Sequence, residues 1–405
     1  GSMRLNQVSI RASGTTVRLS AEVESERQSD PFELYFEFPI AYESFIAPSA
    51  DPFAVAMLIP AMQRGESLTI VPPVSPRLLF NLGRVRDILH SWHPELRRVE
   101  IDATPRSSDP EPLATRAATF FSGGVDSFYT LLKRRGREPL PAPLTHIVFM
   151  RGLEKPLDFL RGVEASEQLV QSIAAEAGVE CIIGESNLRT HFDADWLYLY
   201  CGSGLAATAL SLGHGFSHVC IPSTHSYRNP IPIGTTPIVD ERFSSDRVQV
   251  VHDGAELARP DKLARILEWD RRLVLKHLRV CVMNYGGAYN CCECRKCVRT
   301  MAPLRSLGLL DEAVTFPNKA TGHWAELFRL DSLALVEENL AFARAVAGDP
   351  ALTALLERIV LRRRRKEALR TLLLNSPLKG ALPVVVGTRR RLHGLTQRWR
   401  GTAAR

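Results

Sequence analysis

The sequence predicts an α/β protein with four parts. These are an N-terminal α+β domain (residues 4–103), a linker (104–113), a parallel-sheet domain with a four-cysteine zinc subdomain (114–314), and a helical extension with a basic tail (315–405). Three observations predict this fold. Strand-like and helix-like segments alternate from residue 114 to about 280, which is typical of a parallel sheet with helices on both faces. A glycine-rich turn follows the first strand of this series, and cysteines with metal-ligand spacing end it.

The first hundred residues predict a separate domain without recognisable chemistry. Residues 4–24 form two alternating strands around a Ser-Gly-Thr turn, and 32–38 alternate again. An apolar periodic stretch (51–62), a strand (68–71) and a helix (76–92) follow, and 98–101 close the region. The stretch 104–113 contains three prolines, which favours a linker.

The central domain is predicted from its alternation. We expect strands at 114–121, 146–150, 179–183 and 218–222, and helices from Asp126, at 160–177 and at 196–212. Residues 196–216 contain no charged side chain, but glycines interrupt them, so we expect a buried helix and no transmembrane segment. In such sheets, ligands bind beyond the carboxyl ends of the strands.

Residues 122–127 read Ser-Gly-Gly-Val-Asp-Ser, and this pattern predicts a phosphate-binding loop. The glycines allow close approach of an anion, the serine hydroxyls donate to phosphate oxygens, and the free N–H groups of the helix start add positive potential. Asp126 can hold Mg²⁺. The chain has no Gly-x-x-x-x-Gly-Lys-Ser/Thr motif, so a kinase or GTPase of that class has no support. The alternative is an ordinary turn. The predicted binding residues are Ser122, Gly123, Gly124, Val125, Asp126 and Ser127, of which Ser122, Asp126 and Ser127 are the catalytic candidates.

Cys281, Cys291, Cys294 and Cys297 form a Cys-x9-Cys-x2-Cys-x2-Cys pattern. Four thiolates this close in sequence suit tetrahedral Zn²⁺, whose binding energy can fold the segment around it. An iron–sulfur cluster uses the same ligands and stays open as an alternative. A redox or sulfur-carrying pair also stays open because Cys292 is a fifth thiol beside the set. No secretion signal is apparent, since residues 3–22 alternate polar and apolar residues, so we expect a cytoplasmic protein without a disulfide framework.

The loop is similar to that of the PP-loop ATP pyrophosphatases. Together, the loop and the cysteines resemble the 7-cyano-7-deazaguanine synthase family (QueC, formerly ExsB) over about residues 114–310. The resemblance implies ATP bound by 122–127, zinc bound by the four cysteines, and activation of a 7-deazaguanine carboxylate as an acyl adenylate. In that family ammonia then displaces AMP, and a second ATP dehydrates the amide to a nitrile, in the pathway to queuosine.

The sequence departs from small members of that family in three respects. Cys292 stands where a glycine is common, an N-terminal domain precedes the loop, and a basic extension follows residue 315. An enzyme that needs only ammonia has no evident use for the added domain or the extension, so we infer a macromolecular acceptor or partner. Defence-associated relatives resemble this arrangement and are thought to attach a deazaguanine to a protein amine, which implies a role in antiviral defence.

The formal net charge of +7 arises from the C-terminal tail. Residues 361–405 carry a net charge of +12, so the first 360 residues sum to −5. The basic positions 362–366, 389–391, 398 and 400 could contact nucleic acid, an anionic membrane or an acidic protein, or simply be solvated. Nucleic acid is not the favoured partner, and an oligomer stays open.

These patterns together predict an ATP-dependent ligase whose nucleophile is ammonia or a protein amine. One alternative is a tRNA sulfurtransferase, which shares the loop and would use the tail for RNA and Cys292 for a persulfide. A second alternative is a non-catalytic nucleotide-sensing scaffold. Polar residues after the fourth strand are candidate substrate contacts by position alone. They are Ser223, Thr224, His225, Ser226, Tyr227, Arg228, Asp240, Arg242, His252, Asp253 and Lys262.

Overall fold

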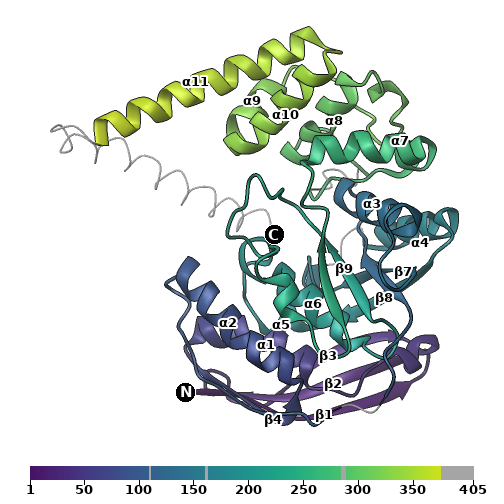
Figure 1. The fold of residues 1–405 in the computed structure, drawn as a ribbon, viewed down its shortest axis with the longest axis vertical. Coiled ribbons are helices and arrows are strands. Elements are labelled where there is room, and N and C mark those ends of the chain that lie inside the picture. Colours follow the sequence, from purple (N-terminus) through teal and green to yellow (C-terminus); the bar gives the residue numbers. More distant parts are fainter. Residues whose placement is uncertain (109–110, 160–162, 284–288, 375–405) are drawn as a thin grey trace. The chain divides into compact units, whose positions relative to one another are not determined.

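The computed structural model describes residues 1–108, 111–159, 163–283 and 289–374 (Figure 1). The predicted basic positions 389–391, 398 and 400 lie outside these ranges. The chain divides into two compact units, residues 1–320 and 321–405. Within the described ranges, no helix is long and apolar enough to cross a membrane.

One mixed, mostly parallel sheet of ten strands runs through the described part of the first unit. Its order is β10 (Gln249–Asp253), β9 (His218–Pro222), β6 (Ala117–Phe120), β7 (Leu144–Arg151), β8 (Glu180–Ser186), β3 (Phe32–Pro39), β2 (Thr16–Ser25), β1 (Ser2–Ser13), β4 (Ser67–Val74) and β5 (Ile101–Pro105). The strands from β10 to β8 are all parallel. The prediction of an α/β fold with a parallel sheet is therefore confirmed. Strand β10 was not predicted from the sequence.

The N-terminal strands join the parallel strands directly. Strand β3 pairs antiparallel with β8, with Phe36 opposite Ser186. The side chain of Asn187 completes this seam, because its Oδ1 accepts the Tyr35 N–H at 2.9 Å and its Nδ2 donates to the Glu33 carbonyl at 2.6 Å. Both sets of strands also share one apolar core. The structure thus differs from the predicted division at 104–113: the first compact boundary follows residue 320.

The main helices of the first unit form two groups. Helices α1 (Asp51–Arg64) and α2 (Pro76–Trp92) lie against the N-terminal strands, and α1 also packs on α6 (Cys201–Ser211) (Figure 1). Helices α3 (Val125–Leu132), α4 (Val163–Ala177) and α7 (Arg259–His277) pack together. In β10, His252 contacts the short helix η5 (Asp240–Phe243), while the next residue, Asp253, contacts α3. Because neighbouring strand residues point to opposite faces, the two groups cover opposite faces of the sheet.

The described part of the first unit contains further helices. They are α5 (Leu188–His191), α8 (Arg295–Ser306), η1 (Ile40–Phe45), η2 (Lys133–Arg137), η3 (Leu157–Phe159), η4 (Trp196–Tyr200) and η7 (Leu310–Glu312). The predicted helix at 196–212 is divided between η4 and α6.

The second unit contains α9 (Trp324–Leu330), α10 (Leu333–Val346) and α11 (Pro350–Leu374). The basic positions 362–366 lie in α11. There, the Arg364 guanidinium forms an ion pair with Glu337 at 2.7 Å.

Candidate functional site

The glycine-rich loop connects β6 to α3 at the carboxyl end of the parallel strands. Gly123 has φ +84°, and a Cβ atom there would lie 3.0 Å from Leu169 Cδ2, so both backbone and space favour glycine. The Ser122 N–H donates to Ser127 Oγ at 3.1 Å, and the Arg279 N–H donates to the Gly123 carbonyl at 2.9 Å. Ser127 is buried in the loop's own turn, whereas Ser122 is exposed. The loop is therefore fixed from both sides, with the Ser122 hydroxyl at its surface.

Asp126, at the start of α3, is paired with two cations from α7. Arg259 Nη2 lies 2.7 Å from its Oδ2, and Lys262 Nζ lies 3.0 Å from its Oδ1. Lys262 is 1% exposed and also donates to the carbonyl and hydroxyl of Ser223 at 2.8 and 3.0 Å. Burial would raise the pKa of Asp126, but the charges and hydrogen bonds of Arg259 and Lys262 outweigh it and lower the pKa to about 2. Asp126 is therefore ionised at neutral pH.

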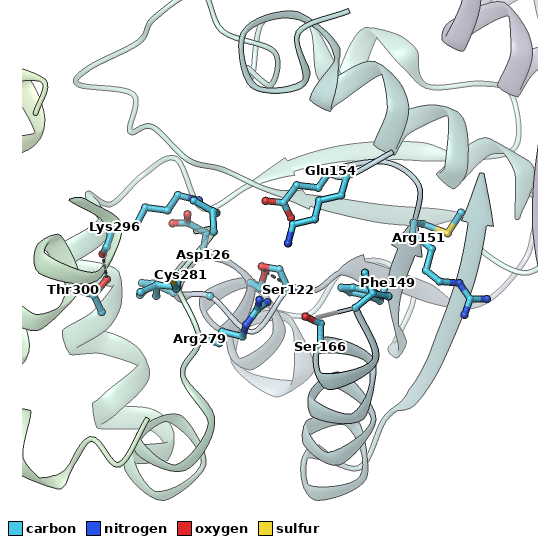
Figure 2. Close-up of a pocket in the computed structure, with 18 of the residues that line it drawn as sticks. Ser122, Asp126, Phe149, Arg151, Glu154, Ser166, Arg279, Cys281, Lys296 and Thr300 are labelled. Atoms are coloured by element: carbon cyan, nitrogen blue, oxygen red, sulfur yellow. Dashed lines mark hydrogen bonds between the residues drawn. The ribbon is translucent and has the colours of Figure 1, made fainter. Parts of the chain in front are cut away.

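A pocket of about 150 Å³ opens beside the loop (Figure 2). Its cationic side chains outnumber its acidic ones, so its potential is positive and suits a multiply charged anion. Phe149 and Met150, at the end of β7, supply an apolar wall. The charged side chains are Arg151, Lys155, Arg259, Arg279 and Lys296, against Asp126 and Glu154.

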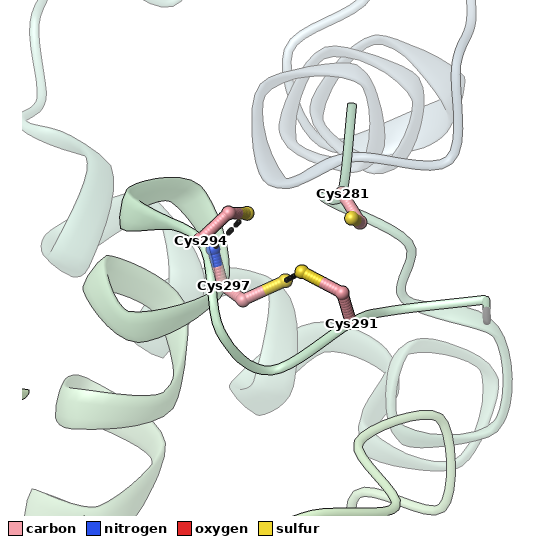
Figure 3. A group of neighbouring side chains, drawn as sticks. All are labelled: Cys281, Cys291, Cys294 and Cys297. Atoms are coloured by element: carbon pink, nitrogen blue, oxygen red, sulfur yellow. Dashed lines mark hydrogen bonds between the residues drawn. The ribbon is translucent and has the colours of Figure 1, made fainter. Parts of the chain in front are cut away.

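The four predicted cysteine ligands come together (Figure 3). The sulfur atoms of Cys281, Cys291, Cys294 and Cys297 all lie within 4.8 Å of one another. Cys294 also caps α8, where its Sγ accepts the Cys297 N–H at 3.5 Å. Such closeness fits one tetrahedral ion, since the thiolates of an iron–sulfur cluster bind different iron atoms and must stand further apart. The cysteines can therefore bind a metal such as zinc.

The metal must displace protons from these thiols. Burial, with the neighbouring cysteines, raises the pKa of Cys291 to about 12. Because only thiolates coordinate, metal binding at this site releases protons and is weakened by acid.

Asn290 fastens this segment and was missed by the sequence analysis. It is fully buried; its Oδ1 accepts the N–H groups of Val280 and Cys281 at 2.9 and 3.2 Å, and its Nδ2 donates to the carbonyls of Leu278 and Thr315 at 2.9 and 3.0 Å. A single side chain thus connects the separate backbone segments around the metal site. An Asn immediately before the first cysteine of the Cys-x2-Cys-x2-Cys run was the only sequence signal.

Cys292 lies outside the ligand set. It is fully buried, has φ +62°, and its Sγ donates to the Asn290 carbonyl at 3.5 Å. Glycine adopts this left-handed backbone at lower cost than any other residue. Cys292 therefore occupies a glycine-like position in the turn.

The metal site and the anion pocket share a wall. Cys281 lines the pocket, and so does Lys296, which stands between Cys294 and Cys297 in the sequence (Figures 2 and 3). Burial, followed by the charge of Arg259, lowers the pKa of Lys296. A metal ion that orders this segment would thereby also order the pocket.

Most polar residues predicted as substrate contacts lie elsewhere. Asp253 accepts hydrogen bonds from Thr130 of α3 and from Arg134 of η2, at 2.8 Å from each, and so fixes β10 to these two helices. Asp240 and His252 form a separate buried pair. The pocket instead uses Arg259, Arg279 and Lys296, which the sequence analysis did not select.

Comparison of the chain with protein-family models, with curated proteins and with solved structures found no match in any of the three.

Proposed function

We propose that the protein is an ATP-dependent ligase that activates a carboxylate as an acyl adenylate and transfers the acyl group to an amine. The carboxylate oxygen attacks the α-phosphorus of ATP and pyrophosphate leaves. The amine then attacks the acyl carbonyl, AMP leaves, and an amide and a proton are formed. A carboxylate is a poor electrophile at neutral pH, and the adenylate supplies the missing leaving group.

The observation that carries this proposal is the arrangement of three features around one pocket. The glycine loop borders the pocket, the pocket has an excess of cationic side chains, and Cys281 of the cysteine cluster lines it as well. Arg259, Arg279 and Lys296 line the pocket, where they would bind phosphate oxygens and stabilise the departing pyrophosphate. Phe149 offers an apolar face to the adenine ring.

Asp126 would hold the magnesium that accompanies ATP, where the ion would neutralise phosphate charge. Both of its carboxylate oxygens accept hydrogen bonds, from Arg259 and Lys262. The proposal therefore requires Arg259 to exchange this carboxylate for a phosphate when ATP binds. Zn²⁺ at the four cysteines would be structural, since all four coordination positions are filled by protein.

The acceptor is proposed to be ammonia or a protein amine, and the acyl donor a 7-deazaguanine carboxylate. Burial of Cys292 gives the sulfurtransferase alternative less support, because a persulfide carrier must reach its substrate.

The test is incubation of the purified protein with ATP, Mg²⁺ and 7-carboxy-7-deazaguanine, with and without ammonium. We expect AMP and pyrophosphate in equal amounts. Formation of ADP in place of AMP would overturn the ligase proposal. So would the absence of turnover both with this acid and after candidate partner proteins are added. Intact-mass analysis of partner proteins would identify a protein acceptor.

A matched pair of variants tests the pocket. Arg279 lines it, whereas Arg272 is exposed on α7 and does not. We expect Arg279→Met to weaken ATP binding at least tenfold and Arg272→Met to leave it unchanged. Equal affinities would place the nucleotide elsewhere.

A further inference from the structure

A second pocket, of about 240 Å³, lies apart from the anion pocket. It is lined by Trp92 at the end of α2, by the prolines and isoleucines of residues 230–238, and by His225 and His252. Residues 230–238 follow β9, and His252 is near the end of β10. The pocket therefore opens at the same carboxyl edge of the parallel strands as the glycine loop, where sheets of this kind bind ligands.

One of the lining residues, His252, is paired with the buried Asp240. His252 Nδ1 lies 2.8 Å from Asp240 Oδ2, and the two residues are 5% and 0% exposed. Asp240 also accepts the Thr235 hydroxyl at 2.5 Å and the Thr236 N–H at 3.2 Å. A carboxylate oxygen accepts hydrogen bonds, so the proton of this contact is assigned to Nδ1, as in the Nδ1–H tautomer of imidazole. Nε2 then carries a lone pair.

This lone pair lacks a partner. Among the described residues, none forms a hydrogen bond to the buried Nε2 of His252. An unpaired buried acceptor is costly, and native proteins rarely retain one without a use. Because Asp240 engages Nδ1 and His252 lines the pocket, Nε2 is the ring nitrogen that remains for a ligand there.

Close packing fixes the pair in position. A Cβ atom on Gly202 would lie 2.3 Å from Asp240 Oδ1 and 2.6 Å from the Gly234 carbonyl, and the Gly202 N–H donates to that carbonyl at 2.7 Å. The absence of a side chain at Gly202 thus allows α6 to lie against Asp240. Asp240 and His252 are held by packing as well as by hydrogen bonds, as a preformed ligand site requires.

The chemistry of the walls defines the ligand. None of the described residues that line this pocket is Lys, Arg, Asp or Glu, in contrast to the anion pocket. Ile231 and Ile238 are 42% and 44% exposed, so the apolar wall extends to solvent. The pocket is somewhat smaller than the range of about 300–1,000 Å³ that is typical for drug-sized ligands. It therefore suits a neutral group of one or two rings that donates one hydrogen bond.

We propose that this pocket binds a neutral aromatic heterocycle whose ring N–H donates to His252 Nε2. The ring faces pack on the prolines and isoleucines, and the in-plane N–H meets the imidazole. This site does not depend on the ATP chemistry proposed above. The site would bind a second ligand, or the ring of a second substrate, at the same edge of the sheet as the glycine loop.

The experiment uses a matched pair of probes, indole and 1-methylindole, which have closely similar shape and differ in the ring N–H. Isothermal titration calorimetry on the full chain should give saturable one-to-one binding of indole, and methylation should weaken it at least fivefold. Equal affinity for both probes, or no saturable binding of either, would overturn the proposal.

A variant provides the second part of the binding test. His252→Phe keeps an aromatic ring but removes the acceptor, so it should bind the two probes equally. A persistent preference for indole in this variant would contradict the assignment of His252. If the variant does not fold, the comparison of the two probes on the unaltered chain still decides.

Discussion

Replacing Asp126 with Asn removes the negative charge that Arg259 and Lys262 share while keeping the shape of the side chain. A pKa of about 2 in place of the ordinary 3.8 corresponds to about 2–3 kcal/mol of stability at neutral pH, since one pKa unit is worth about 1.4 kcal/mol. Breaking a fully buried pair costs about 3–5 kcal/mol. The side chains of Asp126 and Arg259 keep 18% and 15% exposure, so the lower range applies.

The sign of the pH dependence follows from the lowered pKa. The stabilisation is present above the unfolded pKa of about 3.9 and is lost as pH falls towards 2. The stability difference between Asp126→Asn and the unaltered chain should therefore be about 2–3 kcal/mol at pH 7 and should shrink steadily below pH 4. Urea unfolding followed by tryptophan emission measures it, because Trp269 of α7 stacks on Tyr129 of α3.

The matched control is Asp87→Asn. Asp87 is also paired with arginines, Arg86 and Arg98, but it is 49% exposed, so its replacement should cost less than about 1 kcal/mol. A loss at Asp126 no larger than at Asp87, or a difference that does not change with pH, would refute the reasoning from burial.

Three further predictions concern the metal site, a histidine and the sheet. Metal analysis after gel filtration should find one zinc per chain in Cys292→Gly and almost none in Cys294→Ser; equal zinc content would disprove the ligand assignment. Burial, followed by the charge of Arg259, lowers the pKa of His225 to about 4. Its contribution to stability is therefore present above about pH 6.5 and lost as pH falls towards 4. His225→Gln should flatten the pH dependence of unfolding in this range, and an unchanged slope would count against it. A chain that begins at residue 114 should aggregate, because β8 and the shared core lose their cover; a soluble, cooperatively unfolding product would show that the seam is dispensable.

The parts of the site that the sequence predicted are those encoded locally. The turn at 122–127 lies between an apolar strand and a helix, and three of the four cysteines follow one another at helical spacing, so their neighbours in space are also neighbours in sequence. Arg259 and Lys262 are 133 and 136 residues from Asp126, and only the packing of α7 on α3 brings them there.

The architecture shows the same limit. The alternation of strand-like and helix-like segments predicted most strands, but it does not indicate which strands pair with one another. Residues Tyr35 and Asn187, which form the seam between the two sets of strands, are 152 positions apart. The strands and helices of the first hundred residues could be predicted from local patterns. That these strands extend the parallel sheet could not, because it depends on this long-range pairing.

The seam between β3 and β8 has a consequence for self-association. Without the N-terminal strands, β8 would expose a row of unpaired N–H and C=O groups, which invites pairing with other chains. The first hundred residues cover that row with strands of the same molecule. In the described part of the chain, the ends of the sheet are then β10 and β5, so any assembly through strand addition would have to start at one of these two strands.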